Sequence, residues 1–272
     1  MSLDVVVYRD DRPWAIPKLD AFIAGLRKHG IKPEERLTDD WRVSDLAVVW
    51  AHRDTALHEL QLDAGNHYLV CERGYIGDLD NRRRWTSLGY DGLNGHADFC
   101  NAHVGKNRWR RYFSDFMRPW KTGGDYALLM GQVRGDASLT GVDIRGWYAY
   151  ATDRLRAAGW TVMFRPHPRD PVVEPHGAYA LQGDLHSALS MAALVVTWNS
   201  TSAVDAVLGG VGAIAMDLGS MAWDVAGHSI GPERLCKPDR GGWAARLAYC
   251  QWTDAEISGG TAWDHLRHKL DD

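Results

Sequence analysis

The chain has 272 residues, of which 45% are hydrophobic and 24% charged, and this composition indicates a globular protein with a substantial core rather than a disordered one. The formal net charge of −4 and the pI near 6.3 exclude a protein coated with basic surface for nucleic acid. Local basic patches remain compatible with these values.

No apolar segment reaches the ~20 residues of a membrane-spanning helix, and the first residues lack a basic region followed by a long apolar stretch. The sequence therefore predicts a cytoplasmic protein without a membrane partner. The four cysteines, Cys71, Cys100, Cys236 and Cys250, are scattered without the spacing of a metal site, which predicts reduced thiols.

Three apolar runs in the first half, residues 4–8, 45–50 and 68–71, predict buried parallel strands. A helix is predicted over residues 17–29, because its apolar residues have helical spacing and Gly30 follows. Ligands of open α/β sheets bind beyond the carboxyl ends of the strands. The polar residues expected at this edge are Asp10, Asp11, Arg12, His52, Arg53, Glu72 and Arg73.

Residues 74–97 are rich in Gly, Asp, Asn and aromatic residues without a helical period, which predicts a long functional loop. Residues 106–121 are basic and aromatic. They predict either a helix that bridges two domains or a patch for the phosphates of a polymer.

A break at residues 123–125 predicts a domain boundary. Beyond it, strands are expected at 126–130 and 161–164, and helices at 147–158, 185–191, 221–228, 242–251 and within 254–270. Two successive sets of strands alternating with helices predict an α/β fold with two doubly wound, Rossmann-like domains facing each other across a cleft. The expected domains are residues 1–122 and 123–250, with a C-terminal helix in 251–272 that crosses back to the first.

Residues 195–217 predict a strand, a polar turn, a helix and a second strand. Asn199, Ser200, Thr201 and Ser202 form the turn, and all four are residue types that cap helices. Hydroxyls and free backbone N–H groups at a helix start can bind an anion, most often phosphate. The alternative is an ordinary crossover in which these residues only cap the helix.

Two further strand ends in the second half carry small polar or cationic groups, at residues 132–138 and 165–169. The three strand ends together suit a phosphorylated ligand, with His167 and Arg165 offsetting its charge. Pro166 and Pro168 stiffen the backbone around His167 and fix its direction, which favours a functional over a structural role for this histidine.

Several short motifs occur in a defined order: GQ…GDAS at 131–138, RPHP at 165–168, and WNST at 198–201 followed by a strand ending in MD at 217. This series resembles the nucleotide-sugar domain of GT-B glycosyltransferases, in the branch with an HP motif found in capsule-polysaccharide and Kdo-type transferases. In the first half, ERGYIGD and RWTSLGYDGLNG, between residues 72 and 95, resemble phage-encoded glycosyltransferases. A phage-encoded protein would act in the host cytoplasm.

The resemblance implies a nucleotide-sugar donor and no cofactor or metal, since GT-B enzymes can stabilise the leaving phosphate with side chains and helix dipoles. The donor-binding residues that it implies are Gln132, Gly135, Asp136, Ser138, Arg165, His167, Asn199, Ser200, Thr201, Ser202 and Asp217. Asp78 and Asp80 have the spacing of a DxD metal site, but they belong to the predicted loop rather than to a strand end.

Transfer with inversion requires a base that takes the proton of the acceptor hydroxyl. Glu72 is the first candidate, followed by Asp78, Asp10 and Asp11, and His167 is the further catalytic candidate. Each of these carboxylates has an alternative role as a loop cap or as the partner of a nearby arginine.

The predicted function is sugar transfer from a nucleotide-sugar to a hydroxyl acceptor, for which hydroxymethylated pyrimidine in phage double-stranded DNA is a candidate. The predicted acceptor-binding residues are Asp10, Asp11, Arg12, Arg73, Arg84, Trp85, Asn94, Arg108, Arg110 and Arg111. The alternatives are a non-catalytic nucleic-acid-binding protein of the same fold, a nucleotide-sugar epimerase, and a transferase of another group onto modified DNA bases.

Overall fold

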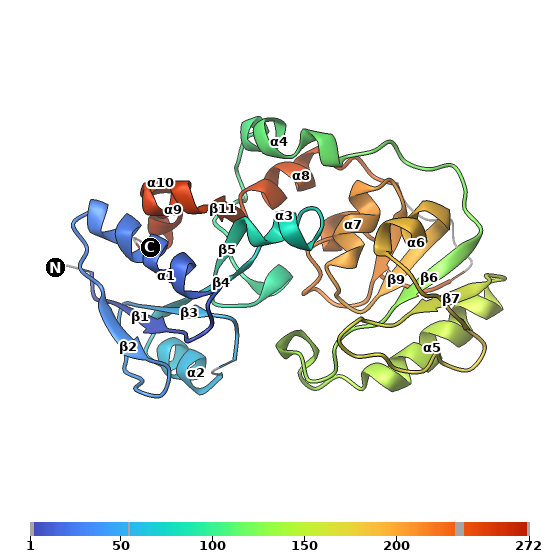
Figure 1. Cartoon of the computed structure of the whole chain (residues 1–272), viewed down its shortest axis with the longest axis horizontal. Helices are drawn as coiled ribbons and strands as arrows, with labels where there is room; N and C mark the ends of the chain where they lie inside the picture. The colour runs from blue at the N-terminus through green and yellow to red at the C-terminus, as the bar shows by residue number, and fades with distance from the viewer. Residues whose placement is uncertain (1–2, 54, 232–236, 271–272) are drawn as a thin grey trace. The chain divides into compact units, whose positions relative to one another are not determined.

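A computed structural model describes residues 3–53, 55–231 and 237–270 (Figure 1). Cys236 lies outside the described residues. The chain forms two compact units: Met1–Arg108 together with Ala245–Asp272, and Trp109–Ala244. Each unit contains one β-sheet with helices packed on it, which confirms the predicted α/β class with two Rossmann-like domains.

The unit boundaries fall at other residues than the expected 122/123 and 250/251. Residues 109–122 group with the second unit, where Arg118 N–H donates to the Leu208 carbonyl (2.8 Å) and Lys121 N–H to the Gly210 carbonyl (2.8 Å). These backbone hydrogen bonds tie the basic segment to the unit that follows it in sequence. The Gly-rich break at 123–125 is therefore an irregular segment within the second unit, directly before β6.

The sheet of the first unit has the strand order β11-β5-β4-β3-β1-β2. Neighbours from β4 to β2 run parallel, whereas β5 is antiparallel to β4 and β11 is antiparallel to β5. Its strands are β1 (Val5–Arg9), β2 (Glu34–Leu37), β3 (Leu46–Trp50), β4 (His67–Arg73), β5 (Trp85–Tyr90) and β11 (Gln251–Thr253).

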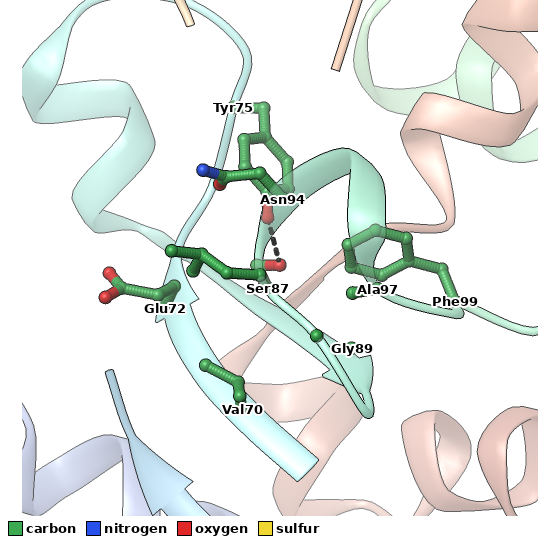
Figure 2. Close-up of a pocket in the computed structure, with 10 residues that line it drawn as sticks. Val70, Glu72, Tyr75, Ser87, Gly89, Asn94, Ala97 and Phe99 are labelled. Atoms are coloured by element: carbon green, nitrogen blue, oxygen red, sulfur yellow. Dashed lines mark hydrogen bonds between the residues drawn. The ribbon is translucent and has the colours of Figure 1, made fainter. Parts of the chain in front are cut away.

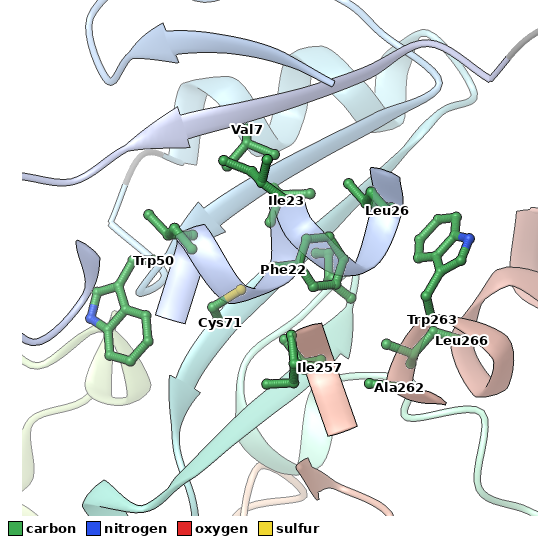
Figure 3. Packing of buried hydrophobic residues seen from close by; sticks show 14 of the residues in the cluster. Val7, Phe22, Ile23, Leu26, Trp50, Cys71, Ile257, Ala262, Trp263 and Leu266 are labelled. Carbon is green, nitrogen blue, oxygen red and sulfur yellow. The ribbon is translucent and has the colours of Figure 1, made fainter. Parts of the chain in front are cut away.

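The helices of this unit are α1 (Ile16–Lys28), α2 (Thr55–Asp63), α3 (Leu79–Arg83), α9 (Asp254–Ser258) and α10 (Thr261–Leu266), with 3-10 turns η1 (Asn94–His96) and η5 (Arg267–Leu270). Phe22 of α1 packs edge-on against Trp263 of α10, with ring centroids 6.0 Å apart (Figure 3). A Cβ atom at Gly25 would lie 2.1 Å from the Ile257 carbonyl, so only glycine allows α1 to approach α9 this closely. The C-terminal segment thus returns to the first unit.

Two sequence predictions in this unit are wrong. Residues 74–97 are not a loop, because they include α3 and the strand β5, whose residues are all buried. The small residues of β5 obscured its pattern: at Gly89 a Cβ atom would lie 2.7 Å from that of Ala97, so the strand needs glycine there. The expected single final helix is broken at Gly260, which has a φ of +89°.

The second unit has a five-stranded, wholly parallel sheet in the order β10-β9-β6-β7-β8. Its strands are β6 (Tyr126–Met130), β7 (Val162–Arg165), β8 (Tyr179–Ala180), β9 (Ala192–Thr197) and β10 (Gly212–Ala215). The remaining helices are α4 (Asn107–Tyr112), α5 (Ile144–Ala157), α6 (Leu185–Met191), α7 (Ser202–Leu208) and α8 (Gly241–Ala248), with η2 (Ser114–Phe116), η3 (Ala137–Leu139) and η4 (Trp223–Val225).

Two more helix predictions fail in part. Residues 221–228 contain only the 3-10 turn η4, because Gly227 pairs with β10: its N–H donates to the Ala213 carbonyl (2.8 Å) and its carbonyl accepts from Ala215 N–H (2.9 Å). The predicted helix 242–251 ends at Ala248 and is followed by β11. No helix in the described part of the chain is long and apolar enough to cross a bilayer.

Candidate functional site

Four strands of the second unit bring polar side chains to one edge of its sheet. Each of these side chains stands two positions after the last residue of its strand, and the strands are parallel, so they share the carboxyl edge. The residues are Gln132 after β6, His167 after β7, Asn199 after β9 and Asp217 after β10. All four belong to the predicted donor-binding set.

Gln132 joins β6 to β9 through buried hydrogen bonds. Its Oε1 accepts from the Thr197 hydroxyl (3.0 Å) and from Asn199 N–H (3.1 Å), and its Nε2 donates to Asn199 Oδ1 (2.8 Å). The Gln132 N–H donates to the Tyr148 hydroxyl (2.6 Å) on α5. Gln132 therefore holds the two strand ends at a fixed spacing.

Asn199 extends this network to the neighbouring loops. Its Nδ2 donates to the Ser138 carbonyl (2.7 Å) and to Asp217 Oδ1 (3.1 Å), which also accepts from Gly219 N–H (2.9 Å). Both Nδ2 hydrogens thus have acceptors within the protein. In this arrangement Asn199 shapes the site, and a ligand would have to take its donors from neighbouring groups.

His167 is half-buried and its ring is oriented by its own turn. Its Nδ1 accepts a hydrogen bond from Arg169 N–H (3.1 Å), so the neutral ring carries its proton on Nε2. Burial, and then the positive charges of Arg169 and Arg165, lower the pKa of His167 from its ordinary value. The ring is therefore a neutral Nε2–H donor near pH 7, and an arriving anion would favour its protonation.

Asp170 and Arg134 link the loops after β7 and β6, and the sequence reasoning missed both. Asp170 is 8% exposed and accepts from Arg134 N–H (2.8 Å), Nε (2.8 Å) and Nη2 (2.6 Å). The Arg134 side chain and its backbone N–H lower the pKa of Asp170 to about 2. The sequence did contain a signal for this pair, because Arg134 in VRGD and Asp170 in PHPRD carry opposite charges and each lies within or beside a recognised motif.

The remaining predicted donor residues lie in the same strand-end loops. Gly135 is exposed with a φ of +73°. Asp136 is the N-cap of η3, and its side chain accepts from the N–H (3.1 Å) and the hydroxyl (2.8 Å) of Ser138. Arg165 donates to the Gly183 carbonyl (3.1 Å).

The turn before α7 is capped differently from the expectation. Ser200 Oγ accepts from Ser202 N–H (3.2 Å) and from its hydroxyl (3.0 Å), whereas Thr201, at the N-cap position, makes no side-chain capping bond. Ser200 N–H in turn donates to the Thr197 hydroxyl (3.1 Å). The serines therefore order the turn.

The first unit shows a different arrangement at the ends of its parallel strands. Arg12 forms an ion pair with Asp10, donates to it from Nε (2.6 Å) and backbone N–H (2.9 Å), and reaches the Trp50 carbonyl (3.3 Å). Burial opposes but does not outweigh the Arg12 hydrogen bonds, which lower the pKa of Asp10. Asp10 is thus committed to a local pair, and Asp11 is exposed beside it.

Glu72, the first candidate base, lines a small, shallow pocket on the first unit. The pocket lies between β4, β5 and residues 92–99, with Glu72 and Phe99 on opposite sides (Figure 2). The Ser87 hydroxyl donates to the Tyr75 hydroxyl (2.9 Å), and Asn94, another predicted acceptor residue, is on the rim. Here a carboxylate, hydroxyls and an amide share one concave surface.

The other predicted acceptor residues are dispersed. Asp78 accepts from Asn81 N–H (2.8 Å) as the N-cap of α3, which is the alternative role considered for it. Arg84, Arg110 and Arg111 are exposed, and Arg73 is half-buried at the end of β4.

Trp85 and Arg108 are buried, which the sequence did not predict. Arg108 donates to the carbonyls of Ala248 (2.7 Å) and Gln251 (2.7 Å), pairs with Glu256, and stacks 4.1 Å from the Trp252 ring centroid. These contacts account for Arg108 as a structural residue of the first unit. Among the described residues, no group of three or more His, Cys, Asp or Glu has the geometry of a metal site.

No protein-family model matches the chain, and no curated protein matches it at the level of sequence. Solved structures do match the chain in fold. The KpsC β-Kdo 2,4-transferase of Thermosulfurimonas dismutans superposes with a TM-score of 0.62 at 13% identity, over 91% of this chain and 90% of that one. The KpsC β-Kdo 2,7-transferase of the same organism gives 0.55 at 12% identity, over 95% and 98%. The fold is therefore that of GT-B glycosyltransferases.

Proposed function

We propose that the chain is a glycosyltransferase whose second unit binds the phosphate of a nucleotide-sugar donor. The observation that carries the proposal is the placement of Gln132, His167, Asn199 and Asp217 two positions after four parallel strands. This edge combines an oriented imidazole donor with a polar network that is already satisfied, so binding requires little reorganisation. The fold that the chain shares with two Kdo transferases supports the same proposal.

The test is a thermal-shift screen of nucleoside mono- and diphosphates and nucleotide-sugars. A ligand present at 100 times its Kd stabilises the fold by about 2.7 kcal/mol, which a melting curve detects. H167A should reduce the shift, because it removes the Nε2–H donor. H186A, which changes an exposed histidine on α6, is the matched control and should keep the shift. Equal shifts in wild type and H167A would contradict the role of His167.

Glu72 is our candidate for the general base, and the first unit for acceptor binding. Its carboxylate shares a pocket with Ser87, Tyr75 and Asn94, which suits recognition of a hydroxyl-bearing acceptor. E72Q keeps the shape and removes the basicity, so transfer should fall by about 10²-fold or more while donor binding persists. Unchanged transfer by E72Q would exclude this base.

The finer proposal for the acceptor is hydroxymethylated pyrimidine in DNA, and it rests on exposed arginines, which are Arg84 of the first unit and Arg110 and Arg111 of α4 in the second. Transfer of labelled sugar to duplexes with and without hydroxymethylpyrimidine tests it, and labelling only of added saccharides would refute it. We further propose that the leaving phosphate is stabilised without metal, so turnover should survive EDTA.

A further inference from the structure

We propose that Asp170 is a positioning residue for the phosphate site, which holds the turn carrying His167 against the loop that follows β6. The inference rests on the proposed function, because it assigns to Asp170 the alignment of groups that the donor phosphate would meet. Asp170 itself is an unsuitable ligand for an anion, since its own charge is negative and already paired with Arg134.

Asp170 joins its own turn to the main chain of the loop that follows β6. Its carboxylate accepts both the backbone N–H and the guanidinium of Arg134, so it fixes the main chain and not only a side chain of the β6 loop. The next residues of that loop are Gly135 and Asp136, which the sequence placed at the donor phosphate. Any movement of Asp170 would therefore move their backbone N–H groups.

Asp170 belongs to a four-residue turn that begins at His167. Asp170 N–H donates to the His167 carbonyl (2.9 Å), while Arg169 N–H donates to the His167 ring at Nδ1 (3.1 Å). The four-residue turn is thus closed through its backbone and through the imidazole. Anchoring one end of this turn anchors the ring.

The two loops are also in contact where they leave the strands β6 and β7. Gly131 N–H donates to the Arg165 carbonyl (2.8 Å), and a Cβ atom at Gly131 would lie 2.9 Å from both His167 N and Pro166 Cα. The two loops are therefore held together at two places, by the Gly131–Arg165 hydrogen bond next to the strands and by the Asp170–Arg134 ion pair further along the loops. A carboxylate ion-paired at this position is a rigid spacer between two halves of one site.

The experiment follows the His167 Cε1–H resonance by NMR during titration with inorganic phosphate, with the signal assigned from H167A. Wild type should show a saturable shift. D170A should bind phosphate about tenfold more weakly while remaining folded, because a misaligned site loses affinity. D170N should recover part of the loss, since its amide oxygen can still accept Arg134 N–H, and R134A should also be intermediate, since it keeps that N–H.

Wild-type affinity in D170A, with only a lowered Tm, would overturn the positioning role while leaving the phosphate site intact. If D170A does not fold, wild-type affinity in both D170N and R134A would overturn it equally. No shift of the His167 resonance in wild type would instead refute the phosphate site, and the positioning role with it. The outcomes therefore separate this inference from the function on which it rests.

Discussion

The two units place their buried polar residues in different parts of the fold. In the second unit, Gln132 and Asn199 interlock at the carboxyl edge of the sheet, where a ligand of this fold binds. In the first unit, a buried polar cluster centred on Arg108 links α4 to residues 248–256, while Asp10 and Arg12 beyond the end of β1 form a local pair. Stability and site formation are therefore coupled in the second unit and separate in the first.

Breaking the Arg108 cluster should have the largest effect on stability. R108A leaves Glu256 without its cation and two carbonyls without donors, and we expect a loss of about 3–5 kcal/mol in the free energy of unfolding. Chemical denaturation measures this loss. Phosphate affinity of the molecules that remain folded should not change, and a matching fall in affinity would contradict the separation drawn for the first unit.

Substitution of Gln132 tests whether stability and ligand affinity are coupled in the second unit. Q132A leaves the Thr197 hydroxyl hydrogen without its acceptor and two groups of Asn199, its N–H and Oδ1, unpaired in a buried site, so unfolding should become easier by about 2–3 kcal/mol. Ligand affinity should fall in parallel, because the same bonds set the spacing of the strand ends. Calorimetry on the folded variant decides whether the two losses occur together.

His58 makes the stability of the first unit depend on pH. It is 4% exposed and stacked on Tyr68, and burial, together with the nearby His52, lowers its pKa to about 3. The unfolded chain binds a proton below about pH 6.5 and the folded chain does not, so stability should fall as pH drops from about 6.5 towards 3. From pH 6.5 to 5 this single group should lower the free energy of unfolding by about 1.6 kcal/mol. H58F keeps the stacked ring and should flatten the profile; an unchanged slope would assign the effect to other groups.

The smallest effect is expected at the exposed arginines. R110A should change the free energy of unfolding by less than about 0.5 kcal/mol, because the side chain is on the surface of α4. If the acceptor is a polyanion, the same variant should weaken its binding and reduce the salt dependence. Unaltered salt dependence in R110A, R111A and R84A would count against a DNA acceptor.

Much of the fold was predictable because apolar runs and strand-end polar residues are local signals. The runs that became β1, β3, β6 and β9 are short and buried on both faces, which identifies parallel strands from sequence. The strand β11 was missed because its partner is remote in sequence, since Gln251 pairs with Ser87. The strand β5 pairs with the nearby β4, but its segment has no alternating pattern of its own.

The candidate site was predictable at the level of residues but not of roles. His167, Asn199 and Asp217 were predicted because they follow strands, and they lie at one sheet edge, yet nothing local shows that both Nδ2 hydrogens of Asn199 are used within the protein. Likewise, Arg108 resembles surface charge in a basic stretch, and only its contacts with residues 248–256 explain its burial. Long-range pairing decides these roles.

The first unit is discontinuous in sequence, since β11 and the helices after it come from the last 28 residues. During synthesis, Trp109–Ala244 leaves the ribosome as one uninterrupted stretch, whereas the earlier 108 residues must wait for the tail before β5, already paired with β4, gains its second neighbour β11. Until then the nascent amino-terminal portion has an unpaired edge on β5, and such an edge is open to pairing with other chains.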